Sequence, residues 1–243
     1  MDVHARQEAA FISACSNGHL AIVHMLLSLG GDRLIDASAS QNAAFRAACK
    51  HNHVAVLQAL LALAGDRAVD VGAMSFEGFR VACASGHVEV VRLLVSQTGQ
   101  HTTNTHTMDE EGFRSADAAG HIEVVRTLLG LAGHRAVDVH AQNDSAFQRA
   151  CSFGHTEVVR ELLALEGERA VDVHACNEGA FRLACANGHI DVVRLLLDLT
   201  DERSVNVHAL TEDAFRRACA NSHANIVQEL LSLTGARKIK VHS

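Results

Sequence analysis

Cysteine and histidine recur four residues apart along this chain, a spacing that places a thiol and an imidazole on one face of a helix. Cys185 and His189, in the segment AFRLACANGH, form one such pair. The two groups together have the chemistry of a nucleophile with its general base, or of two ligands for a zinc ion. A thiol-dependent or metal-dependent enzyme is therefore the first hypothesis that the sequence raises.

The regular return of this pair argues against a reactive centre. The histidine recurs every 34 residues, at His19, His53, His87, His121, His155, His189 and His223. The preceding position holds Cys15, Cys49, Cys83, Asp117, Cys151, Cys185 and Cys219. A catalytic pair is needed once, whereas a residue found in nearly every copy serves what every copy does, which is to pack. Each pair also offers only two of the four ligands of a closed zinc site. We interpret the cysteines as small buried hydrophobic residues and expect no metal and no cofactor.

The composition narrows the classes of partner. With 21 basic and 28 acidic residues the net charge is −7, which argues against a nucleic-acid-binding protein. The chain has no Trp and no Tyr, so it offers little aromatic surface for stacking on bases. No apolar run is long enough to span a bilayer, and the N-terminal residues lack the pattern of a signal peptide. Cysteines spaced one repeat apart are too distant for a disulfide framework, which favours a reducing intracellular compartment, cytoplasmic or nuclear.

Seven copies of a 34-residue period account for nearly the whole chain. Their approximate bounds are 2–35, 36–69, 70–103, 104–137, 138–171, 172–205 and 206–239. Each copy contains two short helical patterns. The first, such as EGAFRLACANG, is small and apolar, and we expect it to begin at an N-cap residue, for example Asn143, Asn177 or Thr211. The second, such as HIDVVRLLLDL, carries an amphipathic stripe formed by Ile190, Val193, Leu196 and Leu197.

The pattern A-C-x-x-G-H-x-E-V-V-R-x-L-L resembles the ankyrin repeat, whose units of about 33 residues combine T-P-L-H-x-A-A with G-H-x-E-V-V and a leucine run. The resemblance covers essentially the entire chain. Gly179, Ala180, Phe181 and Arg182 stand where the family has T-P-L-H, the finger between repeats is shorter, and the loop after the second helix is longer. Such variant repeats are similar to those of large arrays in microbial eukaryotes and large DNA viruses. The resemblance implies an all-α solenoid of seven helix pairs with short fingers, forming one domain over residues 1–243.

The resemblance also implies a function, which is to bind a protein partner on a concave surface of first helices and finger tips, without catalysis. A scaffold or adaptor is the expected role, and an effector delivered into the cytoplasm of a host cell is a narrower form of it. We expect a monomer that binds neither nucleic acid nor membrane. The alternatives are the enzyme with a Cys/His set and a structural spacer with no specific partner. The family's repeated histidines are structural, which assigns His19 and its equivalents to hydrogen bonds with loop backbone.

Candidate binding residues are the positions at which the repeats differ, because packing makes the same demand on every copy and binding does not. On the first helices of repeats five to seven, these are Arg149, Phe153, Leu183, Asn187 and Arg217. Phe153 resembles an aromatic interface anchor with basic surroundings, and local packing under a finger is the alternative. At the finger tips the candidates are Met74, Met108, His140, His174, Cys176, His208 and Leu210. Because Cys176 alone lies outside the repeated cysteine position, we expect it to be the cysteine most accessible to thiol reagents.

Two ladders of polar residues accompany these positions. An arginine follows the repeated phenylalanine at Arg46, Arg80, Arg114, Arg182 and Arg216. Glu110, Glu178 and Glu212 precede three of these arginines by four residues, which predicts ion pairs along the helix. The alternative is a row of arginines, including Arg182 and Arg216, that meets an acidic or phosphorylated partner. The second ladder consists of histidines in the fingers, which are His4, His106, His140, His174 and His208. We expect these side chains to be solvated or hydrogen-bonded to backbone, and the alternative is a pH-sensitive contact with a partner. We also expect Arg114 and His121 to satisfy the charge of Asp117.

Overall fold

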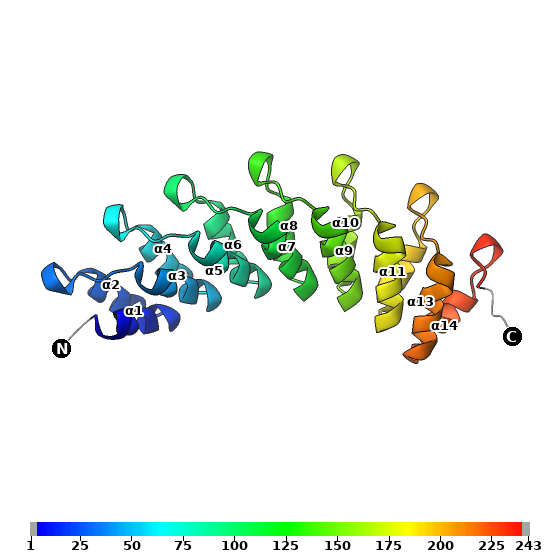
Figure 1. Cartoon of the computed structure of the whole chain (residues 1–243), viewed down its shortest axis with the longest axis horizontal. Helices are drawn as coiled ribbons and strands as arrows, with labels where there is room; N and C mark the ends of the chain where they lie inside the picture. The colour runs from blue at the N-terminus through cyan, green and yellow to red at the C-terminus, as the bar shows by residue number, and fades with distance from the viewer. Residues whose placement is uncertain (1–3, 240–243) are drawn as a thin grey trace. The chain divides into compact units, whose positions relative to one another are not determined.

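The computed structural model describes residues 4–239, and within them it contains fourteen α-helices and seven short 3₁₀ helices, without strands (Figure 1). The first helices of the repeats are α1 (Ala5–Ser16), α3 (Ala39–Lys50), α5 (Ala73–Ala84), α7 (Thr107–Ala119), α9 (Ala141–Phe153), α11 (Ala175–Asn187) and α13 (Ala209–Ala220). The second helices are α2 (Leu20–Leu27), α4 (Val54–Leu61), α6 (Val88–Val95), α8 (Ile122–Leu129), α10 (Thr156–Leu163), α12 (Ile190–Leu197) and α14 (Ala224–Leu231). The repeated helix pairs confirm the predicted all-α solenoid.

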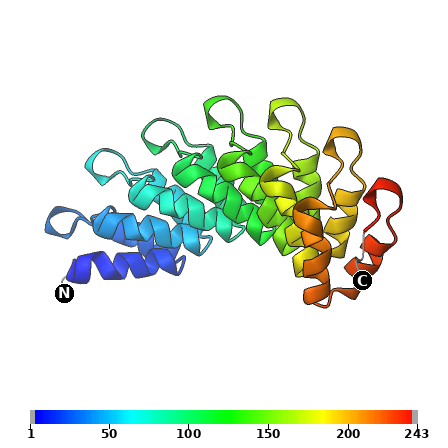
Figure 2. The ribbon, with the colours of Figure 1, turned by 45° about the vertical axis from the view of Figure 1, so that its right-hand side comes forward.

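The contacts divide the chain into two compact units. The N-terminal unit contains the described residues up to Ala116 together with residues 123–137, and the C-terminal unit contains residues 117–122 and the described residues from Asp138 onward. Within each unit the first helices pack side by side, as α1, α3 and α5 do in one and α9, α11 and α13 in the other (Figure 2). The candidate residues of repeats five to seven therefore lie on three adjacent helices of the C-terminal unit.

The core consists of the columns that the 34-residue period predicts. The repeated phenylalanine is buried in repeats one to six, and the repeated cysteine is buried beside it in all of these except the fourth, where Asp117 replaces it. Position 112 shows why small residues alternate with these rings, because a Cβ atom added to Gly112 would lie 2.9 Å from the ring of Phe79. On α12 the buried residues are Val192, Val193, Leu196 and Leu197. The predicted stripe is therefore correct except that Val192, and not Ile190, faces the core.

The turn between the two helices requires a left-handed residue and a histidine from the following repeat. Gly188 has φ 85°, and a Cβ atom there would lie 2.7 Å from the ring of His223. Nε2 of His223 donates a hydrogen bond to the carbonyl oxygen of Ala186 at 2.9 Å. The equivalent bond to a carbonyl 37 residues earlier is made by His53, His87, His155 and His189. The structural assignment of these histidines is confirmed.

Each first helix from repeat two onward begins with three residues in the left-handed region, a feature that the sequence did not predict. In repeat six these are Cys176, Asn177 and Glu178, with φ angles of 57°, 55° and 61°. The right-handed part of α11 follows only after Glu178, and within the described residues the side chains of Asn143, Asn177 and Thr211 make no capping hydrogen bond. The expectation that Asn143, Asn177 and Thr211 act as N-caps is therefore wrong. Asn suits two of these positions because its short polar side chain tolerates left-handed backbone better than most residues do.

The loop after each second helix contains a 3₁₀ turn, and in four repeats the arginine of this turn ties the loop to the preceding repeat. The turns are Gly31–Arg33, Gly65–Arg67, Gly99–His101, Gly133–Arg135, Gly167–Arg169, Asp201–Arg203 and Gly235–Arg237. Nη1 of Arg203 donates to the carbonyl oxygen of Leu163, at the end of α10, at 3.0 Å. Arg237 makes the same bond to Leu197. These bonds satisfy carbonyl groups that a helix C-terminus leaves unpaired, so the lengthened loop is part of the repeat's packing.

Candidate functional site

The candidate site is the face formed by α9, α11 and α13. On this face the arginine ladder has a structural task in every repeat that carries it. Nη1 of Arg182 donates to the carbonyl oxygens of Cys176 and Asn177 at 3.2 and 3.3 Å, which lie in the left-handed turn of the same helix. Where repeat five has glutamine, Nε2 of Gln148 makes the equivalent bond to Asn143 at 2.7 Å. The arginines, with Gln148 in repeat five, thus hold the left-handed start of the first helix in repeats two to seven.

The acidic residues four positions before these arginines pair with the finger histidines. In repeat six Oε1 of Glu178 lies 2.7 Å from Nδ1 of His174 and accepts the backbone N–H of Asn206 at 3.1 Å. Nε2 of His174 donates to the carbonyl oxygen of Glu202 at 2.7 Å. The prediction that Glu178 pairs with Arg182 is therefore wrong. The finger histidine instead links a buried carboxylate of its own repeat to the backbone of the following loop.

The same link is present in each repeat that has a finger histidine. The carboxylate partners of His4, His106, His140 and His208 are Glu8, Glu110, Asp144 and Glu212. A carbonyl oxygen accepts only, so the Nε2 atom that faces it carries a proton, and a proton on Nδ1 then satisfies the carboxylate. The hydrogen bond to the carbonyl of Glu202, with that to Glu178, raises the pKa of His174, and the carbonyl of Glu168 and the carboxylate of Asp144 do so for His140. These interactions favour the imidazolium form.

Arg182, Arg216 and Arg217 converge on a single carboxylate, that of Asp213. One oxygen of Asp213 accepts hydrogen bonds from Nε of Arg182 and Nε of Arg217, each at 2.7 Å. The other accepts from Nη2 of Arg216 at 3.3 Å. Hydrogen bonds from Arg182 and Arg217 lower the pKa of Asp213 although burial acts in the opposite direction, so the carboxylate is ionised at neutral pH. Three candidate residues are brought together here by one residue that the sequence did not single out.

Arg149 and Phe153 lie on α9 of the same face and have no such anchoring. Within the described part of the chain, the side chain of Arg149 makes no hydrogen bond or ion pair. Phe153 is 57% exposed, and the centroid of its ring lies 6.3 Å from that of His155. Asn187 reaches back to this end of α9, where Nδ2 donates to the carbonyl oxygen of Ser152 at 2.7 Å. Leu183 is half-buried, and it occupies on α11 the position that Arg149 has on α9 and Arg217 on α13. An exposed aromatic ring and an unpaired guanidinium thus lie on one helix.

The finger-tip candidates differ in how accessible their chemistry is. Met74, Met108 and Leu210 expose 51%, 57% and 51% of their surface, and Cys176 is exposed as well. The imidazoles of His140, His174 and His208 are each bonded at both nitrogens to groups of the array itself. The apolar tips are therefore available for contact, whereas the histidine nitrogens already have partners.

The cysteines divide into a buried set and two exposed thiols. Burial raises the pKa of the Cys15 and Cys185 thiols to about 12, and raises those of Cys49, Cys83 and Cys151 as well. A buried, protonated thiol is a poor nucleophile and a poor metal ligand. Among the residues that the structure describes, no three His, Cys, Asp or Glu side chains are grouped so as to hold a metal ion. The buried cysteines therefore give no support to a thiol-dependent or metal-dependent site.

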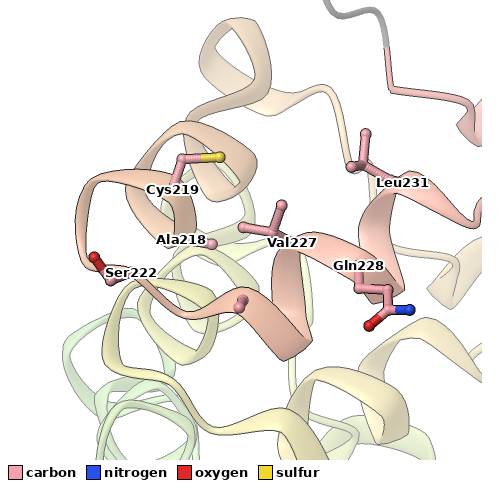
Figure 3. A pocket seen from close by; sticks show the side chains of 7 residues that line it. Ala218, Cys219, Ser222, Val227, Gln228 and Leu231 are labelled. Atoms are coloured by element: carbon pink, nitrogen blue, oxygen red, sulfur yellow. The ribbon is translucent and has the colours of Figure 1, made fainter.

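Cys219 is exposed as well as Cys176, so the cysteine that we expect to be most accessible to thiol reagents is not the only exposed one. It lines an apolar pocket with Val227 and Leu231 of α14 (Figure 3). The equivalent residues of repeat six, Cys185 and Val193, are fully buried where the next helix pair packs on them. The pocket is thus the surface that each preceding repeat of the C-terminal unit uses for stacking. Residue type alone could not reveal the difference, because Cys219 occupies the same repeat position as its buried equivalents.

Asp117 stands in the cysteine column, and its carboxyl group has no hydrogen-bond partner among the residues that the structure describes. The residue has no exposed surface, and both of its oxygens are buried and unpaired. Desolvation therefore raises its pKa well above the usual value. The expectation that Arg114 and His121 satisfy its charge is wrong, since Arg114 bonds to Glu111 and to the carbonyl oxygens of Met108 and Asp109.

Comparison with known proteins agrees with this architecture. A family model described as ankyrin repeats (3 copies) matches residues 113–208 and 147–241. A similar solved structure is that of the human ASB11 ankyrin repeat domain, with a TM-score of 0.54 at 18% sequence identity. The match covers 86% of this chain and 97% of that chain, and at this identity it concerns the fold alone. Comparison with curated protein sequences gave no match. Among the described helices, none combines the length and the apolar character needed to cross a membrane.

Proposed function

Since the chain belongs to the ankyrin repeat family, we propose that it is a non-catalytic protein-interaction module that binds its partner on the face formed by α9, α11 and α13. Ankyrin repeats generally mediate protein–protein interaction. The role is that of a scaffold or adaptor in a reducing intracellular compartment, or that of an effector in the cytoplasm of a host cell. The net charge of −7 favours a monomer through mutual repulsion between copies.

The observation that supports this site is that the exposed ring of Phe153 lies on the same face as Arg149 and Arg217, whose positive charges are not fully neutralised. The repeats differ at all three positions. An exposed aromatic side chain surrounded by polar groups has the character of an interface anchor. Arg149 is unpaired within the described residues, and Arg217 shares its one acid with two further arginines. A partner surface with carboxylate or phosphate groups complements this face, although the chain as a whole is acidic.

The exposed finger tips support a second contact region for the same partner. Met74 and Met108 are large, flexible and apolar, and such side chains adapt to irregular surfaces. They lie in the N-terminal unit, so the two regions are tested separately.

The test compares capture of partners from cell lysate by the native protein and by two triple variants. In the site variant, Arg149, Phe153 and Arg217 are each replaced by Ala. The control variant replaces Arg160, Arg194 and Leu231, which are exposed on second helices, and so removes the same number of charges and one large apolar group. We expect the site variant to lose one abundant partner that the control retains. Equal recovery by all three proteins would contradict the site, and a Met74→Ala, Met108→Ala variant then tests the finger tips.

A further inference from the structure

We propose that Arg182, Arg216 and Arg217 form a binding site for a phosphorylated side chain of the protein partner, with Asp213 holding the three guanidinium groups in place. This inference rests on the proposed function and names the chemistry that the site recognises. Its starting point is that three arginines share one acid. At two other rungs of the arginine ladder, Arg46 pairs with Glu77 and Arg114 with Glu111, so that one arginine meets one carboxylate.

The hydrogen bonds to Asp213 leave much of the donor capacity of the cluster unused. Arg217 bonds to Asp213 through Nε alone, so both of its Nη groups lack a partner among the described residues. Arg216 uses only Nη2, and Arg182 uses Nε and Nη1. Unused N–H groups therefore remain on all three guanidinium groups, whose positions are fixed by the carboxylate and by the carbonyl oxygens of the left-handed turns. A phosphate group has three acceptor oxygens and suits such a fork of donors.

The charge of the cluster also matches phosphate better than a carboxylate. Three guanidinium groups and one ionised carboxylate leave a residual charge of about +2, and a phosphorylated side chain carries about −1.5 to −2 at neutral pH. A single carboxylate from a partner would leave about one positive charge without compensation. The side chain of Arg182 is 17% exposed, so one wall of the site is partly shielded from water, which strengthens the interaction.

Access to the site is open on its outer side. The side chains of Arg216 and Arg217 are 63% and 49% exposed, so an incoming group reaches them without any rearrangement of α13. Arg149 occupies the position of Arg217 two repeats earlier, with Leu183 between them on α11. A partner segment whose phosphate binds Arg216 and Arg217 therefore runs over Leu183 toward Arg149 and Phe153.

The experiment titrates the full chain with three synthetic pentapeptides of alanine whose central residue is phosphoserine, glutamate or serine, and with inorganic phosphate alone. The Nε–H signals of arginine are followed by NMR, because those of Arg182 and Arg217 report on the bonds to Asp213 directly. We expect the phosphoserine peptide to shift these signals and to bind about tenfold more tightly than the glutamate peptide, with no effect of the serine peptide. Equal binding of the phosphoserine and glutamate peptides, or no binding of either, would overturn the proposal.

Two variants and one further ligand complete the test. Arg217→Lys keeps the charge but loses the fork, so we expect severalfold weaker binding of the phosphoserine peptide. Arg160→Ala, on the exposed side of α10, is the matched control and should bind as the native protein does. If inorganic phosphate binds as tightly as the peptide, the site serves a free ion and the proposal of a phosphorylated partner fails.

Capture from phosphatase-treated lysate separates this proposal from the proposed function. A partner that depends on Arg149, Phe153 and Arg217 but is still captured after dephosphorylation would overturn the phosphate site and leave the interaction face intact. Loss of that partner after treatment, restored by rephosphorylation, is the expected result.

Discussion

Replacing Asp117 by cysteine restores the residue that the other six repeats carry at this position, and we expect it to stabilise the protein. Asp117 has no exposed surface, and neither oxygen has a hydrogen-bond partner in the described part of the chain, so a carboxyl group is buried there without compensation. Leaving a buried polar group unsatisfied costs about 1–3 kcal/mol. Keeping a carboxyl group of ordinary pKa protonated at pH 7 costs up to about 4 kcal/mol more. Because the core relaxes in part, we expect Asp117→Cys to gain about 2–5 kcal/mol at pH 7.

The pH dependence separates these two contributions. Desolvation raises the pKa of Asp117 in the folded state, so the folded protein retains a proton that the unfolded chain releases above its ordinary pKa. The penalty is absent below that ordinary value, and it grows as the pH rises toward the folded pKa. The gain from Asp117→Cys should therefore fall to about 1–3 kcal/mol near pH 4, where only the unsatisfied polar group remains.

Asp117→Asn is the matched control, because it keeps the shape and the unsatisfied polar atoms but cannot ionise. We expect it to remove the pH-dependent part of the penalty and to retain the constant part. The assay is denaturant unfolding of the three proteins at pH 4 and at pH 7, followed by helical circular dichroism, with shifts of the midpoint compared because repeat arrays depart from two-state behaviour. A cysteine variant that is no more stable than the native protein would refute the reasoning, as would an asparagine variant with the native pH dependence.

Three further predictions follow from neighbouring features. The carbonyl and carboxylate partners raise the pKa of His140 and His174, so the contribution of these two histidines to stability is present at low pH and is lost as the pH rises through the folded pKa. The His174→Gln variant should therefore lose less thermal stability above about pH 6.5 than the native protein does. In the native protein a thiol reagent should modify Cys176 and Cys219 and leave the five buried cysteines unmodified until unfolding, and peptide mass spectrometry would contradict this if a buried cysteine reacted first. Gly188→Ala should destabilise the protein by more than about 1 kcal/mol, measured as a lower unfolding midpoint, because the added Cβ meets a histidine ring 2.7 Å away in left-handed backbone.

The repeat period predicted the fold, the buried columns and the structural histidines because packing requires the same residue types at these positions in every repeat. A 34-residue spacing that never slips fixes which residues face a neighbouring repeat, and Phe181 and Cys185 are buried as expected. The left-handed start of each first helix could not be predicted in this way. Residues such as Cys176 and Met74 adopt it although their side chains disfavour it, since arginine side chains and the neighbouring repeat hold the backbone there.

The candidate site was predictable in its members but not in their arrangement. Phe153 and Arg217 were selected because the repeats differ at their positions, and the structure exposes the first and pairs the second. Asp213 carried only a weak signal, an acid three and four residues before two arginines. Its bond to Arg182 spans 31 residues along the chain, and no local pattern on one helix contains both partners.

The carboxylates that pair with arginines of a neighbouring repeat determine where this face keeps uncompensated positive charge. The arginine after the repeated phenylalanine has the same role in each repeat that carries it, because its guanidinium group donates to carbonyl oxygens of its own left-handed turn. What differs is the acid that the next repeat supplies. Glu77 neutralises Arg46 alone, whereas Asp213 must serve Arg182 together with two arginines of its own helix. A search for binding surfaces in similar arrays should therefore look for repeats in which the acid is missing or shared, since an arginine ladder by itself marks only the packing of the helix start.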